Sequence, residues 1–148
     1  RYAAFWTSSG GYDAHPLGYG IKAFDMGGHG DVLPVTISNP DQLDLTAYAV
    51  GDSGSLLVTL INKEDGPEGR GADVTVVAGD VIGRPRVMFL TAPGGDAAAT
   101  TGVTLGGAPI ADDGAWHGKW TILPATKMGR CVLRVPAASA AILKFLVQ

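Results

Sequence analysis

Glutamate and cysteine are scarce in this sequence, and long apolar runs are absent. Two glutamates stand against twelve aspartates. Together with 22 glycines in 148 residues, this composition favours turns over helices. The single cysteine, Cys131, excludes an intramolecular disulfide, and its position in the apolar run RCVLRV predicts a small core residue. No apolar run approaches the ~20 residues of a membrane helix, so no membrane partner is expected.

Basic residues are also few, and the histidines show no metal-binding spacing. A net charge of -3 and a pI near 5.4 argue against a nucleic-acid-binding face, which would have to be basic. His15, His29 and His117 are scattered through the chain, without an H-x-H or H-E-x-x-H pattern. We therefore expect no metal and no cofactor. A metal site built from these histidines is possible only if the fold brings them together.

The most informative stretch of the chain is residues 43–63. Its first half alternates apolar and polar residues, the period of a strand with one buried face. Gly51, Asp52, Ser53 and Gly54 follow and favour a turn, and residues 56–61 are apolar on both faces, as in a central strand. Two such runs joined by four turn residues predict a β-hairpin.

The rest of the chain repeats the pattern of a short β run followed by a turn. With 148 residues, 46% of them hydrophobic, the chain is long enough for one domain with its own core. One short helix is expected at residues 16–26, after a loop at residues 7–16. The predicted strands are residues 1–6, 31–38, 43–50, 56–61, 73–78, 84–92, 102–110, 115–123, 130–135 and 139–147. Eight or nine strands after the helix predict an all-β fold, an antiparallel β-sandwich of jelly-roll type.

Four segments, in this order, resemble a known family. They are PLGYGIKAFDMGGHGDVLPV, LTAYAV with GSLLVTLINKE, VMFLTAP with TTGVTLGGAPI and DGAW, and VPAASAAILKF. Their order and spacing resemble the C-terminal end of glycoside hydrolases of family 79, the heparanase and β-glucuronidase-like group. The resemblance implies a catalytic (β/α)8 barrel followed by a β-sandwich. It divides the chain into residues 1–30, the end of the barrel, and residues 31–148, the sandwich.

The resemblance also bears on the chemistry. The two catalytic glutamates of the family lie on barrel strands that would precede Arg1, so no catalytic residue is expected in this chain. Residues 2–6 would be what is left of the last barrel strand. The loop after it would face the sugar, where Gly11 and Tyr12 could contact a uronate carboxylate.

The carboxylates of the chain itself do not form a glycosidase site. Two carboxyl groups about 5–10 Å apart are required, but Glu64 and Glu68 share one Gly/Pro-rich loop, where we expect solvated charges. Asp112, Asp113 and Gly114 predict a tight turn rather than a calcium site, which would need more oxygen ligands.

The aromatic residues give the best indication of binding. Trp116 and Trp120 are four residues apart on a predicted strand, so they would share one face and could stack on sugar rings. Tyr12, Gly11 and Trp6 would add to a sugar-facing surface. The alternative is that both tryptophans cover the core or the interface with a barrel.

Three hypotheses follow. The first is a non-catalytic accessory domain of a family 79-like enzyme that stabilises a catalytic barrel and contacts a uronic-acid-containing or plant polysaccharide. Such a domain would expose an apolar patch around Trp6, Tyr19 and Phe24. The second is a free-standing carbohydrate-binding module, and the third is a small polysaccharide-active or metal-dependent enzyme. An extracellular or periplasmic location is favoured, although one cysteine does not decide the compartment.

Overall fold

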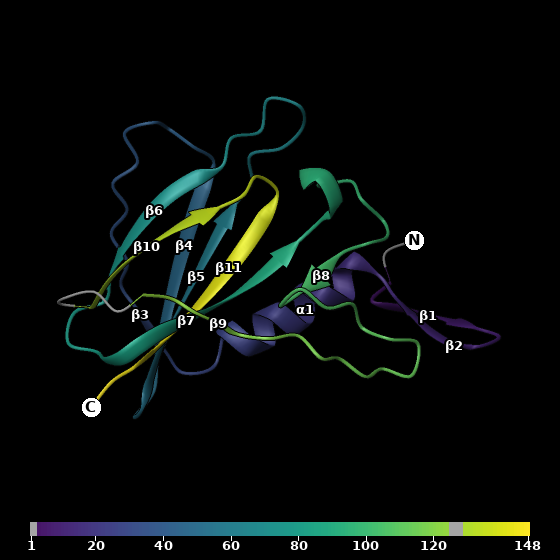
Figure 1. Ribbon diagram of the computed structural model, residues 1–148, viewed down its shortest axis with the longest axis horizontal. Coiled ribbons are helices and arrows are strands. Elements are labelled where there is room, and N and C mark those ends of the chain that lie inside the picture. Colours follow the sequence, from purple (N-terminus) through teal and green to yellow (C-terminus); the bar gives the residue numbers. More distant parts are fainter. Residues whose placement is uncertain (1–2, 125–128) are drawn as a thin grey trace.

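The computed structural model describes residues 3–124 and 129–148 and shows a mainly antiparallel β fold with one α-helix (Figure 1). Its elements in chain order are β1 (Phe5–Ser8), β2 (Gly11–Ala14), α1 (Pro16–Gly27), β3 (Asp31–Leu33), β4 (Leu45–Gly51), β5 (Ser55–Asn62), β6 (Ala72–Val77), β7 (Ile82–Thr91), the 3-10 turn η1 (Pro93–Gly95), β8 (Thr104–Leu105), β9 (Thr121–Ile122), β10 (Arg130–Val135) and β11 (Ser139–Leu146).

The strands form two layers of unequal size. The larger is a seven-stranded sheet in the order β3-β4-β5-β11-β7-β8, with β9 pairing to another part of β7. The smaller contains β10 and β6 alone. Nine strands follow the helix in the described residues, and all of their pairings are antiparallel. The predicted antiparallel β-sandwich with one N-terminal helix is therefore confirmed.

In the larger sheet, the central strand β11 is buried on both faces. In β11, Ala141, Leu143 and Phe145 point to a core shared with β6 and β10, whereas Ile142 points to a second core on the opposite face. This alternation follows from the two-residue period of a strand. Cys131 on β10 belongs to the first core, as predicted, and burial raises the pKa of its thiol.

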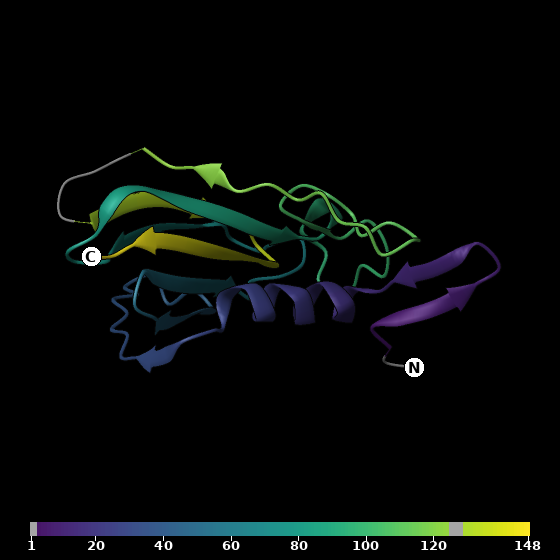
Figure 2. The ribbon, with the colours of Figure 1, turned by 90° about the horizontal axis from the view of Figure 1, so that it is seen from below.

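Helix α1 covers the second face of the large sheet (Figure 2). Tyr19 and Ala23 pack against Met88 and Ile142, and Gly27 comes so close to the sheet that a Cβ atom would meet Thr59 Oγ1 at 2.7 Å. The helix predicted at residues 16–26 is thus confirmed. Its small residues permit close packing, and the sheet supplies the support that a glycine-containing helix needs. Within the described residues, no helix is long and apolar enough to cross a membrane.

The predicted hairpin at residues 43–63 is confirmed as β4 and β5. Gly51 pairs with Leu56, and the turn between them is organised by Asp52. One carboxylate oxygen of Asp52 accepts hydrogen bonds from the backbone N–H groups of Gly54 (2.9 Å) and Ser55 (2.8 Å) and from the Ser55 hydroxyl (3.1 Å). These bonds favour the ionised form and lower the pKa of Asp52.

Three predicted strands are shorter than expected. The strand predicted at residues 31–38 ends at Leu33, because Pro34 has no N–H to donate to a ladder. Of the strand predicted at residues 102–110, only β8 forms, because Gly106 and Gly107 directly after it have positive φ and turn the chain. The strand predicted at 115–123 is only β9.

The N-terminal segment has more strand than predicted. The loop expected at residues 7–16 contains the end of β1 and all of β2, which form a hairpin. Ser9 and Gly10 connect the two strands, so the turn residues that suggested a loop occupy only its tip. Of the strand expected at residues 1–6, the first two residues lie outside the described part of the chain.

Asn62 joins the two layers and is almost completely buried. Its side-chain amide donates to the carbonyl oxygens of Arg70 (2.9 Å) and Val135 (3.1 Å), and its carbonyl oxygen accepts from the Glu64 N–H (3.2 Å). One side chain thus ties the end of β5 to the end of β10 and to the loop before β6.

We expect Asn62→Ala to destabilise the domain. A buried polar group left without a partner costs about 1–3 kcal/mol, and this substitution removes the partner of three groups. Asn39→Ala is the matched control, because Asn39 also bonds two backbone groups, both of Leu43, but in a more exposed place. Urea denaturation should show a clearly larger loss for Asn62→Ala. Equal losses would contradict the linking role of Asn62.

Candidate functional site

The β1–β2 hairpin carries three exposed aromatic residues, Phe5, Trp6 and Tyr12, and extends beyond the first turn of α1 (Figure 2). Trp6 and Tyr12 are 45% and 55% exposed. Trp6 pairs with Asp13, whereas Tyr12 pairs with Thr7, so the two rings lie on opposite faces of the hairpin. The hairpin therefore cannot present both rings to one sugar chain from a single face.

Backbone contacts hold this hairpin on the domain. The Tyr12 N–H donates to the carbonyl oxygen of Asp112 at 2.8 Å, and the Asp112 backbone leaves no room for a Cβ atom at Gly11. At the base of the hairpin the His15 N–H donates to the Ala4 carbonyl oxygen at 2.9 Å, and the His15 ring lies 5.3 Å from the Trp6 ring. The close approach of Asp112 gives Gly11 a structural reason to be glycine.

Trp116 and Trp120 do not lie on one strand, contrary to the prediction. Both are half-buried and pack against the core beneath α1. The Trp116 indole N–H donates to the Leu105 carbonyl oxygen at 2.9 Å, and the Lys22 ammonium lies 4.5 Å from the centre of a Trp116 ring. The predicted geometry of two indoles on a shared strand face is wrong, and the packing of both rings supports their alternative role in the core.

Helix α1 is apolar on two sides. The inner stripe, Tyr19, Ala23 and Gly27, is buried against the sheet. The outer stripe, Leu17, Ile21 and Phe24, is 47%, 55% and 77% exposed. The expected exposed patch around Trp6, Tyr19 and Phe24 thus needs a correction, because Tyr19 is buried and its hydroxyl accepts the Ile110 N–H at 2.9 Å.

The outer stripe could have been recognised from the sequence. Leu17, Ile21 and Phe24 recur at i, i+4 and i+7, the spacing of one helix face. Tyr19 and Ala23 show the spacing of a second face. A single sequence does not say which of two apolar faces a domain buries within itself.

Glu64 forms an ion pair and is not the solvated loop charge that we predicted. Its two carboxylate oxygens bind Arg70 at 2.9 Å (to Nη2) and 3.2 Å (to Nε), and one of them also accepts the Asp44 N–H at 3.0 Å. The hydrogen bonds from Arg70, followed by the one from Asp44, lower the pKa of Glu64 to about 2. This effect is opposite to the raised pKa of a glycosidase general acid. Glu68 is exposed, as predicted.

The other polar candidates have structural contacts. Asp113 accepts the Ala115 N–H at 2.8 Å within the predicted turn. His15 and His29 lie at opposite ends of α1, where His29 is exposed and 2.9 Å from Asp25. Among residues 3–124 and 129–148, no three His, Cys, Asp or Glu side chains are grouped so that they could hold a metal ion.

Two solved structures with a similar fold are those of glycoside hydrolases. The GH51 arabinofuranosidase from Xanthomonas axonopodis pv. citri matches 97% of this chain with a TM-score of 0.57 and 18% identity, over 28% of its own length. CelM2, a bifunctional glucanase-xylanase from a metagenome library, matches 79% with a TM-score of 0.50 and 19% identity, over 18% of its own length. This chain thus spans about a quarter or less of these enzymes. At such identities the likeness shows the fold alone. No curated protein matches the sequence.

The comparison with family models defines the class of this chain, a β-sandwich domain associated with glycoside hydrolases. Residues 47–142 match the model of the glycosyl hydrolase family 79 C-terminal beta domain. The match covers more than half of the chain, and the chain belongs to this family. The predicted resemblance is confirmed. The division at residues 30 and 31 stays a prediction.

The Glu64–Arg70 pair predicts a specific loss of stability in acid. Glu64 has an ordinary pKa of 4.5 and a pKa of about 2 in the folded chain. Its contribution is therefore complete above about pH 4.5 and is lost as the pH falls towards 2. We expect the free energy of unfolding to fall less between pH 6 and pH 3 in Glu64→Gln than in the parent chain. Glu68→Gln, in the same loop, should follow the parent. Urea denaturation at each pH gives the free energy of unfolding. An equal decrease between pH 6 and pH 3 in all three proteins would contradict the assignment.

Proposed function

We propose that this chain is a non-catalytic accessory domain of a family 79-like glycoside hydrolase, which packs against a catalytic barrel through the outer stripe of α1. The exposure of Leu17, Ile21 and Phe24 carries the proposal. A helix on the surface of a free domain usually has a polar outer face, and a helix that is apolar all round is buried in a larger body. A contiguous exposed apolar patch marks an interaction surface.

The carboxylates support a non-catalytic role. A glycosidase needs a pair of carboxyl groups on either side of the scissile bond. Glu64 is paired with Arg70, which lowers the pKa of the Glu64 carboxyl group. The Asp52 carboxylate accepts hydrogen bonds within its own turn, and its pKa is lowered as well. The catalytic pair would then belong to a barrel in a part of the enzyme outside residues 1–148. The alternative of a small metal-dependent enzyme gains no support from the described residues.

Phe24→Asp tests the docking surface. In the isolated chain the substitution should change the free energy of unfolding by less than about 0.5 kcal/mol, because the side chain is exposed. In the longer enzyme, where we propose that Phe24 is buried, it should cost about 1.5–3 kcal/mol. Val132→Asp is the control, since Val132 is 58% exposed on β10, away from α1. Thermal unfolding of the parent, Phe24→Asp and Val132→Asp proteins, each in the isolated and the longer form, measures both effects. An equal loss for Phe24→Asp in the isolated and longer proteins would contradict docking through α1.

A second candidate function is contact with carbohydrate through the β1–β2 hairpin. The exposure of Trp6 and Tyr12 on a hairpin that extends beyond α1 favours it. Each ring could stack on one sugar face, because aromatic rings offer a flat apolar surface next to polar groups. Asp13, opposite Trp6 in the hairpin, is exposed and could accept hydrogen bonds from sugar hydroxyl groups. Trp116 and Trp120 are weaker candidates, because both are packed into the core.

Titration with oligosaccharides tests this candidate. Tryptophan fluorescence should respond to uronic-acid-containing or cellulose-type oligosaccharides. An affinity loss of about tenfold, which corresponds to about 1.4 kcal/mol, is expected for Trp6→Ala or for Tyr12→Ala, according to which face of the hairpin binds the sugar, and not for both. Trp116→Phe should leave the affinity unchanged, since the indole N–H of Trp116 donates to the Leu105 carbonyl oxygen and not to a ligand. The absence of any response to either group of sugars would remove carbohydrate contact from the proposal.

A further inference from the structure

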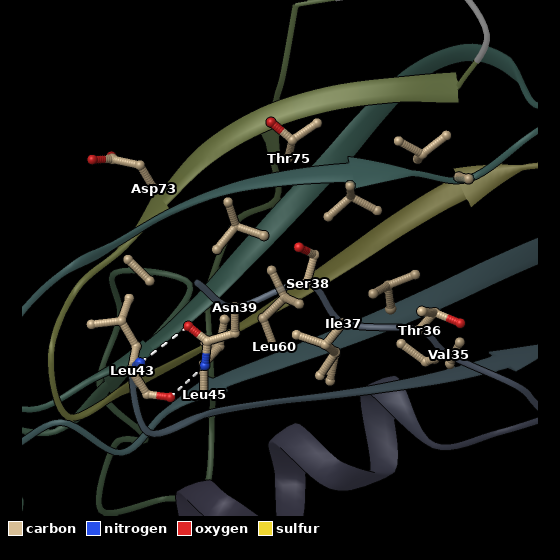
Figure 3. A pocket seen from close by; sticks show the side chains of 18 of the residues that line it. Val35, Thr36, Ile37, Ser38, Asn39, Leu43, Leu45, Leu60, Asp73 and Thr75 are labelled. Carbon is tan, nitrogen blue, oxygen red and sulfur yellow. Dashed lines mark hydrogen bonds between the residues drawn. The ribbon is translucent and has the colours of Figure 1, made fainter. Parts of the chain in front are cut away.

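The large sheet extends beyond its covers on both faces, and the chemistry of the two exposed regions differs. On the face towards the smaller layer, a groove of about 720 Å³ lies beside β6, with residues 35–39 along its other side (Figure 3). Its floor is aliphatic and includes Leu45, Val58 and Leu60, and the described residues that line it include no basic side chain. On the α1 face, beyond the end of the helix, the exposed region carries two adjacent cations.

Arg86 and Lys144 are these cations, and they lie directly opposite each other on the neighbouring strands β7 and β11. Opposite residues of an antiparallel pair share one face, with Cβ atoms about 4.5–5.5 Å apart, so the two positive charges repel each other. Lys144 follows Ile142 by two residues on the same face, and Ile142 lies beneath Gly27 at the end of α1. The pair therefore lies just beyond the last turn of α1, where β7 and β11 extend past the helix (Figure 2).

No carboxylate neutralises this pair within the described residues. Arg86 and Lys144 form no ion pair there, whereas three other Lys and Arg side chains are each paired with an Asp or Glu. Asp52 attracts Lys144 only from beyond ion-pair distance, and its carboxylate already accepts the hydrogen bonds of its own turn. Like charges directly opposite each other are destabilising. The isolated domain thus contains an unfavourable contact that a carboxylate from outside would relieve.

The surroundings of the pair favour a protein surface over a sugar. Ile122 pairs with Arg86, and Leu146 pairs with Ile82 further along the same two strands. These three aliphatic side chains are 56%, 45% and 45% exposed. None of the five residues is aromatic, so a sugar ring would find no stacking platform, whereas arginine among apolar groups is typical of protein interfaces. We call Arg86, Lys144, Ile82, Ile122 and Leu146 the basic patch.

We propose that the basic patch meets the catalytic barrel and that a carboxylate of the barrel, outside residues 1–148, lies between Arg86 and Lys144. This inference rests on the proposed function, because it needs the longer enzyme, and it names the chemistry of the docking surface. A guanidinium binds a carboxylate through two parallel hydrogen bonds. One acidic side chain can therefore pair with Arg86 and neutralise Lys144 as well.

One body can cover both the basic patch and the outer stripe of α1. Both lie on the same face of the large sheet. Phe24 is one helical turn before the end of α1, and Lys144 is two residues beyond Ile142, which lies beneath that end. A surface that buries Phe24 thus needs to extend by only roughly 10–15 Å along the sheet to reach Lys144. The outer stripe would supply apolar contact, and the charges would fix the orientation of the domain.

Zero-length cross-linking in the longer enzyme tests the contact. A carbodiimide joins a lysine amine to a carboxylate as an amide, with loss of water, only where the two groups already touch. Lys144 should become linked to one Asp or Glu outside residues 1–148, which mass spectrometry of the digest identifies. Lys119 is the control and should not reach that acid, because it is exposed and lines a hollow on the opposite face of the sheet, next to Val87. A Lys144 link confined to residues 1–148, a link between two copies of the enzyme, or no link would overturn the proposal.

Removal of one charge gives an independent readout. In the isolated chain Arg86→Gln should raise the Tm by about 1–3 °C, because it removes the repulsion from Lys144. In the longer enzyme it should lower the Tm by about 2 °C or more, because the barrel carboxylate is then buried without its partner. Lys119→Gln should leave both Tm values unchanged.

Two results of this second experiment would overturn the proposal. The first is an effect of Arg86→Gln that has the same sign in both proteins or is absent from the longer enzyme. The second is binding of oligogalacturonate to the isolated chain that Arg86→Gln abolishes, since the basic patch would then be a ligand site.

This inference and docking through α1 can fail separately. An effect of Phe24→Asp that is specific to the longer enzyme, without a cross-link from Lys144, keeps the docking and removes the acidic contact. A cross-link from Lys144 to the barrel, without a specific effect of Phe24→Asp, keeps the acidic contact and removes docking through the helix.

Discussion

The strand β11 needs apolar cover on both of its faces, and the rest of the structure depends on this constraint. Ala141, Ile142, Leu143 and Phe145 are almost completely excluded from solvent. A fully buried Leu, Ile or Phe side chain contributes roughly 1.5–3 kcal/mol, so these few positions are worth as much as the net stability of a small domain. Helix α1 covers one face, and β6 with β10 covers the other. Asn62 then fixes how the smaller layer meets the large sheet.

Both covers leave apolar surface exposed. Two strands do not span a seven-stranded sheet, and the groove beside β6 exposes aliphatic side chains of β4 and β5. Helix α1 covers its face well, but its outer stripe is itself apolar. A domain that had evolved to be alone would gain from polar residues at both places, because apolar patches and free edges promote association. The outer stripe of α1 is the surface that the proposed barrel would cover.

The elements that could be predicted correctly from the sequence are those whose apolar residues recur with a regular period. The hairpin of β4 and β5, the strands β10 and β11 and the helix α1 were recognised from alternation, turn residues and helical spacing. Long-range contacts explain the errors. Trp116 and Trp120 looked like a strand face, but the Leu105 carbonyl and α1 hold Trp116 in the second core. The β1–β2 hairpin looked like a loop, because its stability depends in part on Asp112, a hundred residues away along the chain.

The placement of carboxylates links the fold to the proposed function. Asp52 closes a turn, Glu64 neutralises Arg70 while it accepts the Asp44 N–H, and Asp113 closes a second turn. The bonds accepted by Asp52 and Glu64 favour the ionised form and lower the pKa of both groups, whereas acid catalysis near neutral pH needs a carboxyl group whose protonated form is favoured. These three carboxylates thus shape loops and turns. In an enzyme built from a barrel and this sandwich, as we propose, proton transfer would depend on carboxyl groups of the barrel. The sandwich would contribute by stabilising the barrel.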